Sequence, residues 1–143
     1  MNTDQLPLPE PQDPLFGRVI YAYTRAQAIE DGVLVDVSET GQQVGFKFPV
    51  AITEALLGRL TPTRADQSLG QDYEGRLWDV LWLAAFTGRL ADRGEDTMNF
   101  TVVLQEVNAQ SGKPQNTDLR LWAVCGPGDN AEPVVTIGFP ADF

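Results

Sequence analysis

The sequence contains no histidine, and Cys125 is its single cysteine among 143 residues. Without histidine, the chain cannot assemble a Ser-His-Asp or Cys-His nucleophile, nor a zinc site of the usual histidine-bearing kind. One cysteine also excludes an internal disulfide and a cysteine-rich metal site. Any chemistry of the chain's own would depend on carboxylates, Arg, Lys, Tyr or a carboxylate-bound Mg²⁺. We therefore expect no cofactor, and an enzyme is the less favoured class of function.

Long apolar runs are also missing, because no stretch approaches the roughly 20 apolar residues that cross a membrane. The first letters, MNTDQLPLPEPQDP, hold no basic residue and no apolar run, unlike a secretory signal peptide. A single cysteine without an export signal suits a reducing compartment. We therefore expect a cytoplasmic protein that does not act at a membrane.

Basic residues are scarce, with 10 Lys and Arg against 20 Asp and Glu, and the net charge is −10. Nucleic-acid backbones are bound by clustered Lys and Arg that displace counterions, so direct nucleic-acid binding is not expected. An acidic chain instead suits a protein partner with a basic surface, or mimicry of nucleic acid, although solubility alone also explains the charge. Solubility is the stronger explanation of the charge by itself, and a protein partner with a basic surface is left open.

Apolar residues make up 43% of the chain, which is enough for the core of one domain of ordinary size. Residues 3–14 differ, since four prolines are spaced there among polar residues. Proline lacks an N–H and restricts the residue before it, which predicts a proline-rich, extended or disordered arm over residues 1–14. Residues 15–143 are then predicted to form a single α+β domain.

The segment YAYTRAQAIEDGVLVDVSE, residues 21–39, surrounds a short apolar pattern with charged residues. Thr24 and Gln27 have the spacing of a capping box, and Gly32 suits the left-handed residue that ends a helix. A helix over residues 24–31 and a strand over residues 33–38 are predicted, after a weaker strand over residues 17–23.

The remaining pattern predicts more helices first and strands afterwards. Residues 50–60 are predicted to be helical, between a turn (TGQQVG) and a loop (TPTRADQSLGQ). Residues 72–91, DYEGRLWDVLWLAAFTGRLA, are apolar around most of a helix circumference and predict a long buried helix. Alternating patterns over residues 99–107, 117–125 and 133–139 predict three strands. The predicted fold class is α+β, with two to three helices, one long and buried, packed on an antiparallel sheet that ends in a three-stranded meander.

Four stretches of the sequence resemble a family of uncharacterised small bacterial proteins that phages, plasmids and integrated mobile elements encode. They are YTRAQAIEDGVLVDVSE, GFKFPVAIT, GQDYEGRLWDVLWLA and CGPGDNAEPVVTIGFP, and the resemblance covers residues 15–143. No catalytic residue comes to this chain with the resemblance. It implies an accessory gene product that acts inside a bacterial cell.

The first candidate site lies around the predicted helix-to-strand turn and comprises Tyr23, Arg25, Glu30, Asp31 and Asp36. As a site, an arginine clamp with carboxylates would bind a phosphorylated ligand or Mg²⁺. As structure, a capped helix with exposed charges explains every residue except Asp31, an acid at the unfavourable end of the helix dipole. The structural interpretation is the stronger of the two.

The second candidate site lies on the long helix, where Arg76 and Asp79 are three residues apart and can pair, for about 0.2–0.5 kcal/mol if exposed. Trp78 and Trp82 beside them have the spacing of a stacking platform for bases or flat ligands. Burial contributes up to about 5 kcal/mol for each indole, so the core explains both tryptophans better. If the Arg76–Asp79 pair proves buried, it becomes a site candidate.

These observations favour a non-enzymatic, acidic accessory protein of a mobile genetic element that acts by binding another protein. Inhibition of a host defence or nucleic-acid-processing complex is one form of that role. The alternative is a small carboxylate-dependent enzyme or a domain for a phosphorylated ligand, which requires Arg25, Glu30, Asp31 and Asp36 to converge in a pocket. A self-assembling protein, paired through the open edge of the meander, is a third possibility.

Overall fold

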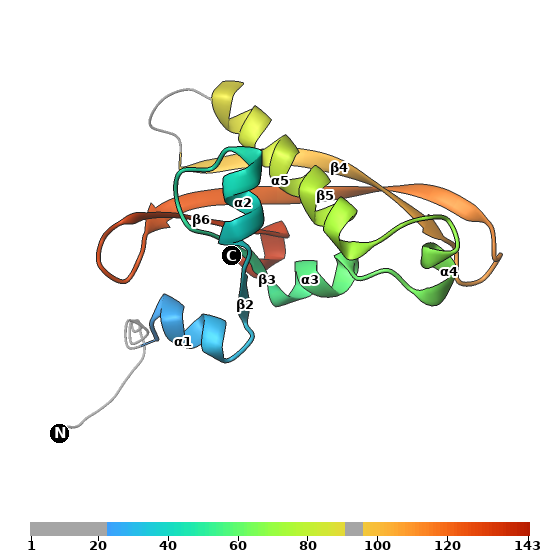
Figure 1. Ribbon diagram of the computed structural model, residues 1–143, viewed down its shortest axis with the longest axis horizontal. Helices are drawn as coiled ribbons and strands as arrows, with labels where there is room; N and C mark the ends of the chain where they lie inside the picture. The colour runs from blue at the N-terminus through green and yellow to red at the C-terminus, as the bar shows by residue number, and fades with distance from the viewer. Residues whose placement is uncertain (1–22, 91–95) are drawn as a thin grey trace.

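Five strands form one sheet in the order β2-β3-β6-β5-β4 in a computed structural model, which describes residues 23–90 and 96–143 (Figure 1). The strands are β2 (Leu34–Asp36), β3 (Val50–Thr53), β4 (Thr97–Val107), β5 (Pro114–Pro127) and β6 (Pro133–Gly138). Neighbours run antiparallel, except that β3 and β6 are parallel. The α+β class and the meander β4-β5-β6 are confirmed, whereas the sheet, predicted to be antiparallel, is mixed because β3 pairs with β6 in parallel. The predicted arm over residues 1–14 and most of the predicted strand over residues 17–23 lie outside the described residues.

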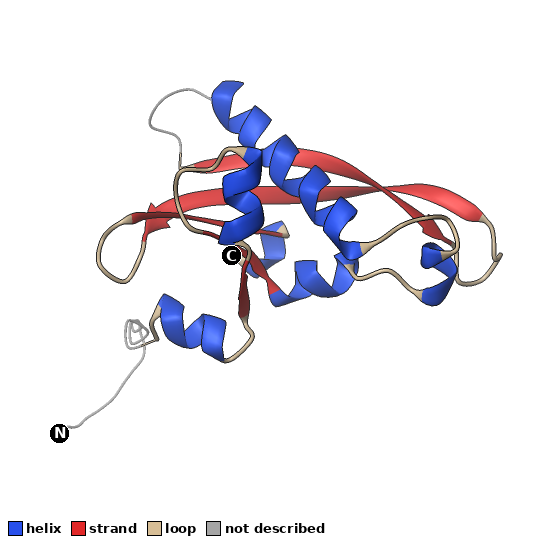
Figure 2. Cartoon of the chain, viewed as in Figure 1, coloured by secondary structure: helices blue, strands red, loops and turns tan. Residues whose placement is uncertain are grey.

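Short helices and one long helix flank this sheet (Figure 2). They are α1 (Arg25–Glu30), α2 (Ser38–Val44), α3 (Glu54–Leu60), α4 (Arg64–Gln67), α5 (Tyr73–Leu90) and the 3-10 helix η2 (Pro140–Asp142). Within residues 23–90 and 96–143, no helix has both the length and the apolar character needed to cross a bilayer.

The core lies between one face of the sheet and the helices α3 and α5. Its fully buried members are Val50, Ile52, Leu56, Leu60, Val80, Leu81, Leu121, Ala123 and Ile137. Because side chains alternate along each strand, the residues that β3, β5 and β6 contribute to the core are spaced two apart. Burial of a large apolar side chain contributes about 1.5–3 kcal/mol, so this cluster holds the two layers together.

The long helix α5 is confirmed, but only one side of it is buried. The side chains that join the core are Leu77, Val80, Leu81 and Ala84. On the other side, Trp78, Trp82 and Phe86 keep 39%, 47% and 42% of their surface exposed. The prediction of a helix buried nearly all round is wrong in this respect, because among the described residues no second layer covers the outer side of α5.

The segment predicted to be helical from Val50 onward begins with a strand. All four residues of β3 are buried, between β2 on one side and β6 on the other. The helix α3 starts only at Glu54, because Thr53 caps it by accepting a hydrogen bond from the Leu56 N–H at 3.3 Å. A short apolar run in a central strand has the same pattern as a buried helix turn, so periodicity alone did not separate them.

Two segments predicted as a turn and a loop contain short helices instead. The helix α2 covers most of TGQQVG and ends at Gly45, whose φ is 123°. The helix α4 lies within TPTRADQSLGQ and begins with a capping box between Thr63 and Asp66. The capping box that was predicted, at Thr24 and Gln27 of α1, is confirmed.

The C-terminal helix η2 is fastened to the sheet through one carboxylate. The Thr53 hydroxyl donates a hydrogen bond to Asp142 Oδ2 at 2.7 Å, and the Phe139 N–H donates to the same oxygen at 2.8 Å. Gly138 lies against this contact, since a Cβ atom there would be 2.5 Å from Thr53 Cγ2 and 2.8 Å from Asp142 Oδ2. The close approach of η2 to β3 therefore requires glycine at this position.

We expect Gly138→Ala to lower the free energy of unfolding by about 1–3 kcal/mol, because the added methyl group overpacks the contact between Thr53 and Asp142. Gly126→Ala on the neighbouring strand is the matched control, since nothing lies within 4 Å of its added Cβ. Urea denaturation of the two variants measures the difference. Equal effects of the two substitutions would contradict this account of Gly138.

Candidate functional site

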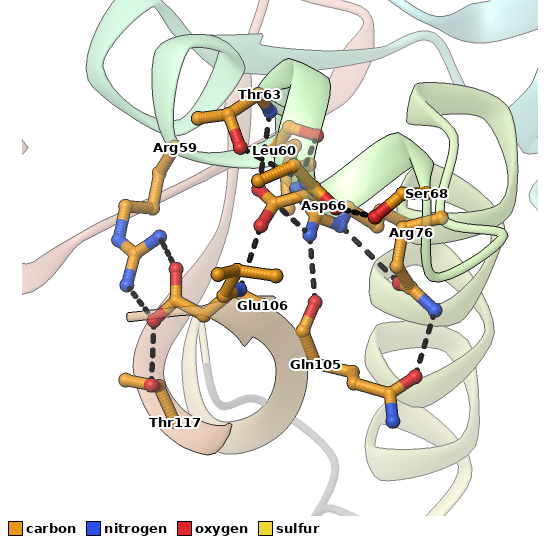
Figure 3. Close-up of polar contacts among 12 residues, drawn as sticks. Arg59, Leu60, Thr63, Asp66, Ser68, Arg76, Gln105, Glu106 and Thr117 are labelled. Atoms are coloured by element: carbon orange, nitrogen blue, oxygen red, sulfur yellow. Dashed lines mark hydrogen bonds and ion pairs between the residues drawn. The ribbon is translucent and has the colours of Figure 1, made fainter. Parts of the chain in front are cut away.

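A buried ion pair joins α4 to α5 near the end of β4 (Figure 3). Arg76 Nη2 lies 3.3 Å from Asp66 Oδ2, and both residues are only 4% exposed. The capping box of α4 positions Asp66, whose Oδ2 accepts a hydrogen bond from the Thr63 N–H at 3.1 Å. Its Oδ1 accepts another from the Val107 N–H at 2.7 Å. The pair therefore ties two helices to the edge strand of the sheet.

The guanidinium of Arg76 is directed to acceptors of the protein itself. It donates to the Gln105 carbonyl at 2.7 Å, to the Leu60 carbonyl at 3.3 Å and to the Gln71 side chain at 3.4 Å. A buried cation is tolerated when its donors are paired in this way. These contacts make Arg76 a structural residue rather than a group offered to a ligand.

The carboxyl group of Asp66 is held in its charged form. Burial works to raise the pKa of Asp66, but the hydrogen bonds from the Val107 and Thr63 N–H groups, the Thr63 hydroxyl and the Arg76 guanidinium outweigh it. The pKa of Asp66 is therefore below its ordinary value, and the carboxylate stays paired at neutral pH.

The expected pairing of Arg76 with Asp79 is not what the structure shows. Arg76 faces α4 and β4, whereas Asp79 lies on an exposed flank of α5 beside Trp78 and Trp82. The second candidate site is thus divided between the interior and the surface. Asp66 was missed because an ion pair between two helices leaves no local spacing signal, although Thr63-x-x-Asp66 carries the pattern of a capping box.

A second ion pair, between Arg59 and Glu106, lies near the first (Figure 3). Arg59 donates two hydrogen bonds to the Glu106 carboxylate, at 2.7 and 2.9 Å, and the Thr117 hydroxyl donates a third at 2.6 Å. The hydrogen bonds from Arg59 are the main cause that lowers the pKa of Glu106 to about 2. Burial opposes this shift, and Thr117 and Gln115 add to it.

The first candidate site is partly assembled around Arg25. Its guanidinium is half-buried and donates to the Thr136 hydroxyl at 2.7 Å and to the Val135 carbonyl at 3.0 Å. Arg25 lines a hollow of about 330 Å³ together with Asp36 and two acids from the turn after β5, Asp129 and Glu132. Burial lowers the pKa of Arg25, and the nearby carboxylates oppose this shift.

Three residues of that candidate site do not line the hollow, namely Tyr23, Glu30 and Asp31. The Tyr23 hydroxyl donates a hydrogen bond to Asp31 Oδ2 at 2.9 Å, which gives Asp31 a structural role. Glu30 is exposed and does not line the hollow. Asp129, which sequence reasoning missed, accepts hydrogen bonds from the N–H groups of Arg25 and Ala26 and so holds the start of α1. Within residues 23–90 and 96–143, no group of three or more His, Cys, Asp or Glu side chains is placed to hold a metal ion.

A separate hollow of about 480 Å³ lies between α5 and β4, and we call it the α5–β4 groove. It is lined by Trp78, Asp79, Trp82, Leu83, Thr101, Val102 and Val103. The indole of Trp82 stacks on the ring of Phe86, with centroids 5.3 Å apart. Val103 on β4 also lines the groove and is 57% exposed, and its side chain lies on the face of the sheet opposite to the buried Val102.

The strand β4 lies at the edge of the sheet, so alternate main-chain groups along it face away from β5. The Cys125 N–H binds the Asp96 carbonyl at 2.7 Å, and the Asn108 N–H binds the Lys113 carbonyl at 2.8 Å. In the observed register, the hydrogen-bonded pairs between β4 and β5 therefore fall at the even-numbered residues of β4. The N–H and C=O groups of the odd-numbered residues therefore face outward.

Side chains from α4 and α5 occupy only part of this outer edge. The Gln105 carbonyl accepts from Arg76, and the Val107 N–H donates to Asp66. For Asn99, Thr101 and Val103, the hydrogen bonds among residues 23–90 and 96–143 include none to the outward main-chain groups. The α5–β4 groove is thus bordered by an open stretch of strand edge that begins where the Arg76–Asp66 pair ends.

Comparison with known proteins shows that the chain belongs to DUF6573, a family of unknown function, whose family model matches residues 16–143. No curated protein and no solved structure matches the chain. The resemblance to a family of uncharacterised proteins is confirmed over nearly the residues expected.

We expect Asp66→Asn to lower the free energy of unfolding by about 3–5 kcal/mol, because it leaves the Arg76 charge buried without its counter-ion. Asp79→Asn, which removes an acid from the exposed flank of α5, should change the free energy of unfolding by less than about 0.5 kcal/mol. Urea denaturation at neutral pH compares the two variants. A larger loss from Asp79→Asn would show that Arg76 depends on Asp79, the acid nearer to it in the sequence.

We also expect the ion pair of Glu106 to make stability pH-dependent. Its pKa is about 2 in the folded chain against an ordinary 4.5, so its contribution is complete above pH 4.5 and is lost as the pH falls toward 2. Since Arg59 is 36% exposed, solvent screening limits the contribution to about 1 kcal/mol. Glu106→Gln should therefore lower stability at pH 6 and match the native chain near pH 2. A deficit that stays constant across this range in denaturation experiments would refute the assignment.

Proposed function

We propose that this member of DUF6573 acts by binding another protein through the α5–β4 groove, without catalysis. The observation that carries the proposal is a continuous apolar surface beside an unpaired strand edge. Trp78, Trp82 and Phe86 stand four residues apart along one side of α5, and the two tryptophans line the groove beside the outer edge of β4. Contiguous apolar surface of this kind marks interaction sites on soluble proteins, whereas single exposed apolar residues do not.

The residue types of the groove support a protein as the ligand. Tryptophan is enriched among the residues that dominate protein–protein binding energy, because its large ring is buried in a partner's pocket at low entropic cost. Trp82 keeps nearly half of its surface in water in the unbound chain, although it also stacks on Phe86. A partner that covers both rings would bury the apolar surface that they expose in the unbound chain.

The net charge of −10 supports a partner with a basic surface, since opposite charge speeds and orients association. We place this binding in the cytoplasm of a bacterium, for an accessory protein carried by a mobile genetic element. A host defence or nucleic-acid-processing complex is the kind of target that this charge suits, because such complexes present basic surfaces to nucleic acid.

A ligand site at Arg25 is the weaker alternative. Its guanidinium already donates to Thr136 and Val135, and Asp36, Asp129 and Glu132 lie around it. These three carboxylates would repel a phosphate group, which removes much of the reason for an arginine clamp. The hollow around Arg25 therefore supports a phosphorylated ligand less well than the groove supports a protein.

We expect the tagged chain to capture a partner from lysate of its bacterial host in a way that depends on the groove. Trp82→Ser should reduce the captured partner by about thirtyfold or more, as for a residue that contributes 2 kcal/mol or more to binding. Phe48→Ser is the control of similar exposure, because Phe48 is 44% exposed against 47% for Trp82 and does not line the groove. Capture is measured by quantitative mass spectrometry at low and moderate salt.

A partner that both variants retain equally would count against the groove as the binding surface. Binding that weakens as salt rises would support the charge complementarity between the acidic chain and a basic partner. Circular dichroism of Trp82→Ser checks that the fold is kept, which is expected because Trp82 lies outside the buried core.

A further inference from the structure

We infer that the α5–β4 groove takes one extended segment of the partner as a sixth strand of the sheet, with a lysine or arginine side chain against Trp78, Trp82 and Asp79. This inference rests on the proposed function and adds the mode of binding and the chemistry of the partner. Strand addition to an exposed edge supplies affinity through main-chain hydrogen bonds and specificity through alternate side chains.

The open edge has the geometry that an added strand requires. Asn99, Thr101 and Val103 are two residues apart, and each directs one N–H and one C=O away from β5. An extended segment can pair with all three residues in a single register. The contacts of Arg76 and Asp66 with Gln105 and Val107 close the edge beyond this point, so they set one end of the added strand.

The edge also lacks the features that usually keep strand edges apart. Residues 97–105 of β4 contain no charged residue, no proline and no glycine, although 21% of the whole chain is charged. Exposed edges in soluble proteins are commonly protected by lysine, proline or a bulge. Their absence from the middle of this strand is expected when another strand pairs there.

The position of α5 favours a single segment over a second copy of the chain. The helix α5 packs on β4 itself, and Figure 1 shows it crossing the long β4-β5 ribbon. Paired strands lie about 4.8 Å apart, whereas packed helices need about 8–10 Å between their axes. Two copies joined edge to edge with their helices on the same face would bring the two α5 helices toward each other across the joint edge. A lone strand has no such helix and fits beneath the tryptophans.

Charge in the groove selects the side chain that the added strand presents to α5. Residues directly opposite each other share a face of the sheet, so the partner residue opposite Val102 points toward α5. There it meets the indoles of Trp78 and Trp82 and the carboxylate of Asp79, and among the described residues no Lys or Arg lines the groove. Indole faces attract cations, and Asp79 adds an opposite charge, so a lysine or arginine suits this position.

The test uses three synthetic peptides and nuclear magnetic resonance of the full chain labelled with ¹⁵N. The first, acetyl-Thr-Val-Thr-Lys-Thr-Val-Thr-amide, places Lys on the same face as its two Val residues. The second replaces Lys with Glu, and the third replaces the Thr residues on either side of Lys with Pro, which removes main-chain donors. We expect the first peptide to shift the amide signals of Asn99, Thr101 and Val103 and the indole signals of Trp78 and Trp82. It should bind about tenfold more tightly than either other peptide.

Two charge variants identify the contribution of Asp79. Asp79→Lys should abolish the preference for the Lys peptide over the Glu peptide. Asp118→Lys is the matched control, because it makes the same change in net charge from β5, where Asp118 pairs with Val103 on the opposite face of the sheet. The control should keep at least half of the preference.

Three outcomes would overturn the inference. Absence of shifts at the β4 amides with millimolar Lys peptide, or equal binding of the Pro peptide, excludes strand addition. Equal binding of the Lys and Glu peptides excludes the cationic side chain. A dimer in sedimentation experiments that Trp82→Ser dissociates assigns the groove to a second copy. If lysate capture depends on Trp82 while the peptides fail, protein binding stands and only this mode of binding is wrong.

Discussion

The buried contact between Arg76 and Asp66 is the interaction on which the arrangement of α4, α5 and β4 depends. Two charges withdrawn from water are tolerated only when their remaining donors and acceptors are paired. Here the partners are main-chain groups at the ends of separate elements, including the Leu60 carbonyl and the Val107 N–H. The pair therefore fixes where three elements meet, and this requirement is more specific than the burial of apolar surface alone.

The same contact decides how much of the sheet edge stays open. Because Arg76 and Asp66 bind the outward groups of Gln105 and Val107, they act in place of a neighbouring strand at that end of β4. They also hold α5 over the edge strand, so its outer side meets solvent rather than a second layer. Stability and the exposed aromatic surface thus have one structural cause.

The sequence predicted those features of the fold that depend on contacts between residues close together in the chain. The capping box at Thr24 and Gln27, the extent of α5 and the alternation of the meander strands all depend on neighbours along the chain. The strand β3 was mistaken for a helix, because only its two flanking strands distinguish them. The partner of Arg76 and the cap that Asp129 provides to α1 were missed for the same reason, since each involves an element that packing brings near.

The second candidate site shows why the surface was harder to predict than the fold. Residues close in sequence on α5 were expected to act together, but one helix turn sends Arg76 into the interior and Asp79 and Trp78 to the groove. The pattern of a helix that is apolar on most sides does not say how many layers will cover it. With a single layer of sheet beneath α5, its remaining apolar side became surface.

The net charge of the chain can protect an edge strand that carries no charged residue in its middle. Edge strands are usually guarded by a charged residue within the strand, which would also prevent a partner from pairing there. In this chain the acidic residues lie outside residues 97–105, and the net charge of −10 repels a second copy at a distance. The basic partner that we propose would be attracted by the same charge and would meet an uncharged edge on contact. The charges that would repel a second copy and attract such a partner therefore lie outside the strand. The main-chain groups of the strand itself stay free to pair.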